Sequence, residues 1–142
     1  MAQNLNITVL GLSITSSWGN GHATTYRQLV RALAQRGHKV LFLERDMPWY
    51  RAQRDLPAPP YGSTRLYGGL DELYDTYAAH IRQSDLVIVG SYVPDGVAVG
   101  RWALTTAGGI TAFYDIDTPV TLAKLESGDY EYTSEATEHV RA

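Results

Sequence analysis

The sequence predicts an α/β domain built on a doubly wound parallel sheet of about five strands. Short apolar runs alternate along the chain with segments whose apolar residues have helical spacing. The range 7–43 contains a strand, a helix and a second strand, which together make a right-handed parallel βαβ unit. The run 86–90 is apolar almost throughout, as expected of a strand that is buried on both faces.

The residues of each segment predict the strands and helices in chain order. The expected strands cover 7–12, 39–44, 63–67, 86–90 and 110–115. The first expected helix begins between residues 20 and 24. The later expected helices cover 71–83, 94–106 and 120–125. Gly37 fits the left-handed position after the first helix, and Pro94 fits the first turn of a later one. The proline-rich range 47–62 predicts a long loop with one helical turn at 50–54.

Composition limits the classes of protein to which the chain can belong. Its 142 residues predict a single domain over 1–142, and 44% hydrophobic with 19% charged residues is typical of globular proteins. A net charge of −3 without a Lys/Arg cluster argues against a nucleic-acid partner, and the lack of cysteine excludes disulfides. The start of the chain lacks the features of a signal peptide, and no apolar run has membrane-spanning length. We therefore expect a cytoplasmic protein with no membrane span.

The range 16–27 links the first strand to the first helix through a glycine-bearing loop. Glycines let backbone amides approach a ligand closely, and a helix N-terminus attracts anions, so we expect Gly19, Asn20 and Gly21 to bind a polar ligand. In the alternative interpretation the glycines only turn the chain. Trp18 either projects into the site as a stacking platform or tucks under the loop as a small core anchor. The range 13–22 is expected to be mobile without a ligand.

Polar side chains gather where the predicted strands end. These ends are the ranges 13–22, 44–46, 90–95 and 115–117. In doubly wound sheets, ligands bind outside the carboxyl ends of the strands. We therefore expect Tyr92 of the third range, with Asp115 and Asp117 of the fourth, to bind substrate beside the glycine loop.

Three titratable groups at these strand ends can carry chemistry. A helix N-terminus lowers the pKa of His22 and favours a neutral imidazole, which can act as a general base or simply bond its own loop. Asp115 and Asp117 share a face and can hold a divalent cation, or Asp117 or Thr118 caps the next helix. Glu44 occupies the position of a ribose-binding acid, or is a solvated strand end.

A nicotinamide-binding domain is excluded by spacing. Its fingerprint requires Gly-x-Gly-x-x-Gly directly after the first strand. Here six residues separate Leu12 from Gly19, and Thr24 occupies the third glycine position. The loop is therefore too long for the tight turn that holds a pyrophosphate.

Several stretches resemble a known family. The range 19–22, followed by 29–43 with Arg36-Gly37-His38 before a hydrophobic strand, resembles the start of a GT-B glycosyltransferase. The ranges 50–61 and 113–122 are similar to the amino-terminal half of CgeB-type (spore-maturation-protein-like) glycosyltransferases. The resemblance covers roughly residues 5 to 130.

The resemblance implies a Rossmann-like domain that is the amino-terminal, acceptor-side half of a GT-B architecture. Such an enzyme transfers a sugar from a nucleotide-sugar donor, here to an unknown acceptor, and the donor is a substrate, so no cofactor or metal is expected. His22 would be the catalytic base that deprotonates an acceptor hydroxyl, or would help to orient the donor phosphates. The carboxy-terminal domain, which holds most of the donor nucleotide, is absent from this chain, and 126–142 is expected to be a polar tail or the start of an interdomain segment.

Three further expectations follow from this interpretation. A half-enzyme exposes its cleft-facing edge, so weak homodimerisation is expected. A non-enzymatic α/β module that binds a ligand or a protein is the alternative function. A metal-dependent transferase that uses Asp115 and Asp117 is a third hypothesis.

Overall fold

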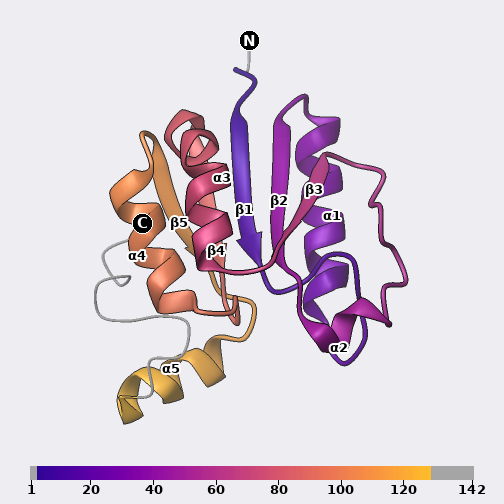
Figure 1. The fold of residues 1–142 in the computed structure, drawn as a ribbon, viewed down its shortest axis with the longest axis vertical. Helices are drawn as coiled ribbons and strands as arrows, with labels where there is room; N and C mark the ends of the chain where they lie inside the picture. The colour runs from indigo at the N-terminus through magenta and orange to yellow at the C-terminus, as the bar shows by residue number, and fades with distance from the viewer. Residues whose placement is uncertain (1–2, 129–142) are drawn as a thin grey trace.

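The computed structural model describes residues 3–128, which form a parallel five-stranded sheet between helices (Figure 1). The strands are β1 (Asn6–Gly11), β2 (Lys39–Arg45), β3 (Ser63–Tyr67), β4 (Leu86–Gly90) and β5 (Ile110–Tyr114). The helices are α1 (His22–Gln35), α2 (Pro48–Arg51), α3 (Leu70–Gln83), α4 (Gly96–Thr106) and α5 (Thr118–Ser127). The predicted α/β class with a Rossmann-like doubly wound sheet is confirmed.

The strand order is β3-β2-β1-β4-β5, and all four pairings are parallel. The chain winds outward from β1 in one direction and then resumes at β4 on the other side, so the order reverses between β1 and β4. At this position Val9 lies opposite Phe42 on one side and Ile88 on the other. Ligands of doubly wound sheets bind beyond the carboxyl ends of strands at such a reversal.

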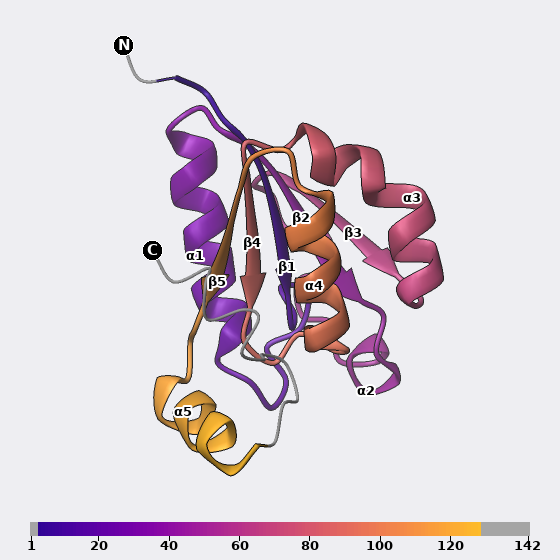
Figure 2. The ribbon, with the colours of Figure 1, turned by 90° about the vertical axis from the view of Figure 1, so that its left-hand side faces the viewer.

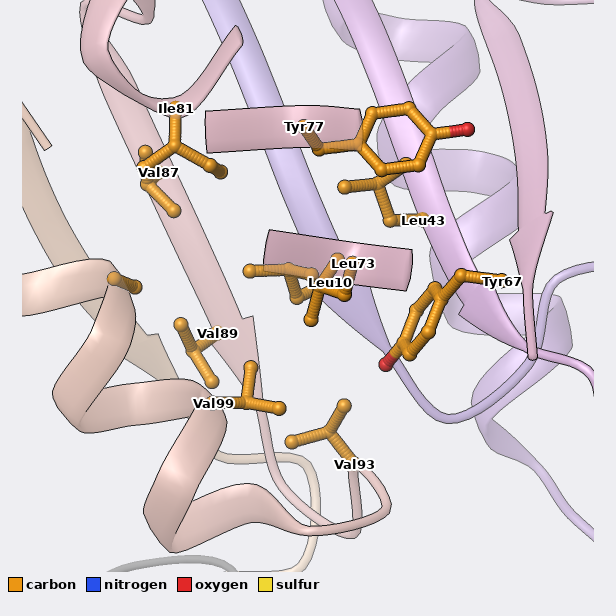
Figure 3. Close-up of a cluster of buried hydrophobic side chains, with 11 residues drawn as sticks. Leu10, Leu43, Tyr67, Leu73, Tyr77, Ile81, Val87, Val89, Val93 and Val99 are labelled. Atoms are coloured by element: carbon orange, nitrogen blue, oxygen red, sulfur yellow. The ribbon is translucent and has the colours of Figure 1, made fainter. Parts of the chain in front are cut away.

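Two apolar cores hold the helices on the sheet. On one face, Leu10 and Val89 of the sheet contact a cluster to which α3 contributes Leu73 and α4 contributes Val99 (Figure 3). On the other face, Val9, Phe42 and Ile88 pack with Tyr26 and Val30 of α1. Each fully buried side chain of this size contributes about 1.5–3 kcal/mol, so these contacts fix the helix ends against the strands.

Tyr26 fills the α1 side of the strand reversal. A Cβ atom added at Gly11 or at Gly90 would overlap with Tyr26, so both strand ends require glycine to accommodate this ring. The ring of Tyr26 also packs edge-on against Phe42, with ring centroids 5.0 Å apart. The core therefore extends to the last residues of β1 and β4, and the loops beyond them start from a rigid base.

The edge strand β5 is covered less than β4. Four of the five residues of β4 are buried, whereas no residue of β5 is, and Ile110 is 69% exposed. Figure 2 shows α5 beyond the carboxyl end of β5 and not against its face. The weak self-association expected from the sequence stays a prediction.

Most element boundaries match the expectation from the sequence. The helical turn in the proline-rich range is an exception, because it covers Pro48–Arg51 and not 50–54. Pro48 occupies the first turn of this helix, where its missing N–H costs nothing. Gly37 has a φ of 90°, as predicted for the residue that ends α1. Within residues 3–128, no helix is long and apolar enough to cross a membrane.

Candidate functional site

A cavity of about 420 Å³ lies at the carboxyl-terminal edge of the sheet. It is lined by Leu12, Gly19, Asn20, Gly21, His22, Tyr50, Tyr92, Ile116 and Asp117. These residues come from the segments that follow β1, β2, β4 and β5, so the cavity spans the reversal of strand order. This is the position at which a doubly wound sheet binds its ligand.

A larger groove of about 790 Å³ lies at the opposite, amino-terminal edge. Polar groups that line it are bonded within the protein: His38 Nδ1 accepts the Leu5 N–H at 3.0 Å, and the hydroxyls of Thr8 and Ser84 are 2.7 Å apart. These bonds tie the start of β1 to its neighbours. We interpret this groove as structural and the carboxyl-edge cavity as the candidate site.

Glu44 fixes the first half of the glycine loop. Its side chain is fully buried and accepts the N–H of Ile14 at 2.6 Å and the N–H of Thr15 at 3.0 Å. The Thr15 hydroxyl donates to the second carboxylate oxygen at 2.6 Å, and the Arg54 guanidinium lies 3.8 Å away. Both interpretations offered by the sequence, a ribose-binding acid and a solvated strand end, are therefore wrong for Glu44.

Asp55 fixes the same loop from the outside. Its carboxylate binds both terminal nitrogens of Arg27, at 3.1 and 3.0 Å, and accepts the N–H and the hydroxyl of Ser17. These bonds, first of all the one to Arg27, hold the pKa of Asp55 well below its usual range. Ile14, fully buried, adds an apolar anchor. The expected mobility of 13–22 does not fit this first half, whose backbone is tied to two other segments.

The second half of the loop opens toward the cavity. Asn20 accepts the N–H of Ala23 at 3.1 Å through its side-chain oxygen and so caps the first turn of α1. Gly19 has a φ of 66°, which favours glycine, and no atom lies within 4 Å of a Cβ added at Gly19 or Gly21. The backbone of this half is therefore accessible to a ligand at the N-terminus of α1.

His22 is the first residue of α1 and is 8% exposed. Its Nδ1 atom is buried and has no hydrogen-bond partner among the described residues, so the alternative in which His22 bonds its own loop is not supported for this atom. Burial lowers the pKa of His22, and the charges of Asp117 and Asp115 partly oppose this by raising it. The imidazole is therefore neutral near pH 7 and retains an acceptor nitrogen.

Two side chains complete the wall of the cavity around His22. The Tyr92 ring meets the imidazole edge-on, with centroids 5.5 Å apart and an angle of 89° between the rings. The backbone of Tyr92 has a φ of 63°, which is an uncommon conformation for a bulky residue. Tyr50, on α2, is 5% exposed and lines the cavity from the β2 side.

The two aspartates after β5 differ in their roles. Asp115 Oδ1 accepts the Thr121 hydroxyl at 2.9 Å and the Asp117 N–H at 3.2 Å, so Asp115 fixes the turn into α5. Of the two predicted caps, Asp117 and Thr118, Asp117 is the N-cap residue of α5, but its side chain makes no capping bond and the residue lines the cavity. Among the described residues, no group of three or more His, Cys, Asp or Glu could hold a metal ion.

Six of the eight predicted site residues line the cavity: His22, Gly19, Asn20, Gly21, Tyr92 and Asp117. Asp115 lies behind it, and Trp18 lies outside it with 53% of its surface exposed, which excludes the tucked interpretation. Sequence reasoning missed Leu12, Tyr50 and Ile116. The aromatic residues of the range 47–62 were the one available signal for Tyr50.

Comparisons of this chain with protein-family models, with curated proteins and with solved structures find no match. The functional interpretation therefore depends on the geometry of the site.

Proposed function

We propose that this domain forms the acceptor side of a glycosyltransferase active site, with His22 as the general base. The observation that carries the proposal is the position of His22 in the wall of the cavity, as a histidine whose pKa is lowered by burial. A general base must be neutral at the working pH and must reach the proton that it removes. His22 meets the first condition by its environment and the second by lining the cavity.

The charge around the cavity supports the acceptor side over the donor side. The residues that line it include an aspartate but no lysine or arginine in the described part of the chain. A nucleotide sugar carries a diphosphate, which proteins bind with cationic side chains, metal ions or glycine-rich helix N-termini. The glycines at the N-terminus of α1 are a feature of this kind, but the Asp117 carboxylate beside them opposes an anion, so we propose that the cavity takes the acceptor and not the donor diphosphate.

The chemistry proposed for the site is a single displacement at the anomeric carbon of the donor sugar, with the acceptor oxygen as the nucleophile. His22 accepts the proton of an acceptor hydroxyl as that oxygen forms its bond to the anomeric carbon of the donor sugar, and the bond from that carbon to the nucleoside diphosphate breaks. The Asp117 charge stabilises the imidazolium that results, since it raises the pKa of His22. Asn20 and Tyr50 provide hydrogen-bonding groups for other acceptor hydroxyls.

The test is release of nucleoside diphosphate by the full-length protein from a panel of nucleotide sugars and acceptors. We expect His22→Gln to lower kcat by about 10²- to 10⁴-fold, the usual contribution of a general base. His80→Gln is the matched control, because His80 is exposed on α3, away from the cavity. No consumption of any nucleotide sugar by well-folded protein would contradict the proposal.

A second candidate is a module that binds a neutral polar ligand without catalysis. The lack of a basic side chain in the described lining favours this alternative, because such a cavity can bind a sugar without a donor. Calorimetry separates the two candidates: saturable binding of an acceptor by protein that turns over no donor identifies the binding module.

A further inference from the structure

Two of the three tryptophans of the chain are exposed, and both belong to the segments that build the cavity. Trp18 is 53% exposed and Trp49 is 51% exposed. The third, Trp102, packs against Tyr74 with ring centroids 4.9 Å apart, on the face covered by α3 and α4. Large exposed aromatic side chains beside a cavity are typical of binding surfaces.

Both tryptophans are attached to fixed backbone next to residues of the cavity wall. Trp18 precedes Gly19, its N–H donates to Ser16 Oγ at 3.2 Å, and its carbonyl accepts the Asn20 side-chain amide at 3.1 Å. Trp49 precedes Tyr50, and their rings meet edge-on with centroids 6.0 Å apart. The indoles therefore stand on the anchored rim of the cavity and not on free loop tips.

The two segments lie side by side on the β2 side of the cavity. Ser16 Oγ donates to the Gln53 carbonyl at 2.7 Å, and the Leu56 N–H donates to the Thr15 carbonyl at 3.0 Å. Asn20 from the first segment and Tyr50 from the second both line the cavity. Trp18 and Trp49 are therefore each next in sequence to a residue of this cavity wall, Gly19 and Tyr50.

We propose that Trp18 and Trp49 form an aromatic platform that stacks on sugar rings, so that the acceptor is a neutral oligosaccharide. The inference rests on the proposed function and names the class of its acceptor. A pyranose presents an apolar face of C–H groups, which packs on an indole, and a rim of hydroxyls, which bonds polar groups such as those of Asn20 and Tyr50. A sugar unit beyond the reacting one would lie on the platform.

The charges around the two tryptophans favour a neutral ligand over an anionic membrane. The four arginines of the segments around the platform are each paired with an aspartate: Arg27 with Asp55 at 3.0 Å, Arg45 with Asp95 at 2.6 Å, and Arg51 and Arg54 with Asp46 at 3.4 and 2.8 Å. Anionic lipids attract surfaces with an excess of cationic side chains. A neutral ligand is therefore favoured over lipid phosphates.

The test measures binding without any donor. In the 142-residue chain carrying Trp102→Phe, the tryptophan fluorescence comes from Trp18 and Trp49, and it is followed during titration with cellohexaose, maltohexaose and chitohexaose. We expect a saturable change with at least one of them, and we expect Trp18→Ala and Trp49→Ala each to weaken binding by about three- to tenfold. Leu104→Ala is the control, since Leu104 is exposed on α4.

Calorimetric titration of the wild-type protein and the two alanine variants gives the same comparison without the Trp102 substitution. No saturable binding of any of the three oligosaccharides, or binding unchanged in both alanine variants, would overturn the platform. A response only to phosphatidylcholine vesicles with 20% phosphatidylglycerol, added in a separate arm, would also overturn it.

Turnover distinguishes the platform from the proposed function. Because stacking acts on ground state and transition state alike, the alanine variants should raise the acceptor KM and leave kcat nearly unchanged. If both variants transfer sugar with an unaltered KM, the platform proposal is wrong and the proposed enzyme function stands. If the protein binds oligosaccharides but transfers no sugar, the proposed enzyme function is wrong and the platform proposal stands.

Discussion

At the carboxyl-terminal edge of the sheet, polar residues gather on the β2 side and on the β5 side. Their side chains differ in how many hydrogen-bond partners the protein gives them. On the β2 side, the carboxylates of Glu44 and Asp55 are bonded to loop amides, hydroxyls and arginines. On the β5 side, His22 has a buried nitrogen without a partner in the described residues, and Asp117 lines a cavity. The comparison teaches that a polar residue at a strand end indicates a ligand only where neighbouring protein groups leave it unbonded.

The largest expected effect is on stability, at Glu44. We expect Glu44→Ala to lower the free energy of unfolding by about 3–5 kcal/mol, because it leaves two amides, a hydroxyl and the Arg54 charge without their partner in the interior. Denaturant unfolding followed by circular dichroism measures the loss. Glu72→Ala is the control, since Glu72 is exposed and accepts one N–H, that of Gly68, and should lose no more than about 1 kcal/mol. A loss below that control would show that the β2 side is not a structural network.

Substitutions at the two loop glycines should affect stability and ligand binding differently. Gly19→Val should destabilise the protein by about 1–3 kcal/mol, because a β-branched residue is strained at a φ of 66°. Gly21 has a φ of −90° and open space around it, so Gly21→Val should leave thermal stability nearly intact while its side chain obstructs the entrance beside His22. Thermal unfolding and acceptor binding of both variants test this. If stability collapsed in Gly21→Val, the open half of the loop would be scaffold and not site.

A fall in pH should lower the free energy of unfolding, because Asp55 on the β2 side loses its charge. Its pKa is lowered in the folded protein, so the carboxylate contributes stability at pH values above its unfolded pKa of about 4, and that contribution disappears as the pH falls through the lower folded pKa. The effect is small, because the side chain is about half exposed to solvent. The free energies of unfolding of the wild type and Asp55→Asn should therefore differ at pH 7 and converge toward pH 2. A constant difference across this range would contradict the Arg27–Asp55 account.

The sequence was sufficient to predict the fold because each element carries its own local signal. Apolar runs mark β1 and β4, and Gly37 marks the end of α1. The order of strands then places the loops at one edge, which is why most of the predicted site residues meet in one cavity.

The roles of the polar residues depend on contacts between distant segments, which a sequence pattern does not contain. Glu44 becomes structural only because Thr15 and Arg54 converge on it from other loops. Asp117 occupies the N-cap position of α5, but the side chain of Asp115 makes the bonds of that turn. Tyr50 reaches the cavity because α2 follows β2 at the same edge.

The central claim, that His22 is a largely buried and neutral imidazole at the ligand edge, is tested most directly by its titration. Nitrogen-15 NMR of the four histidines, with His22 assigned by its loss in His22→Gln, gives the pKa in the wild type and in Asp117→Asn. Burial lowers the pKa and the Asp117 charge raises it, so the account predicts a wild-type value below 6.5 and a still lower value in Asp117→Asn. A pKa at or above 6.5, or one that Asp117→Asn leaves unchanged, would contradict the account.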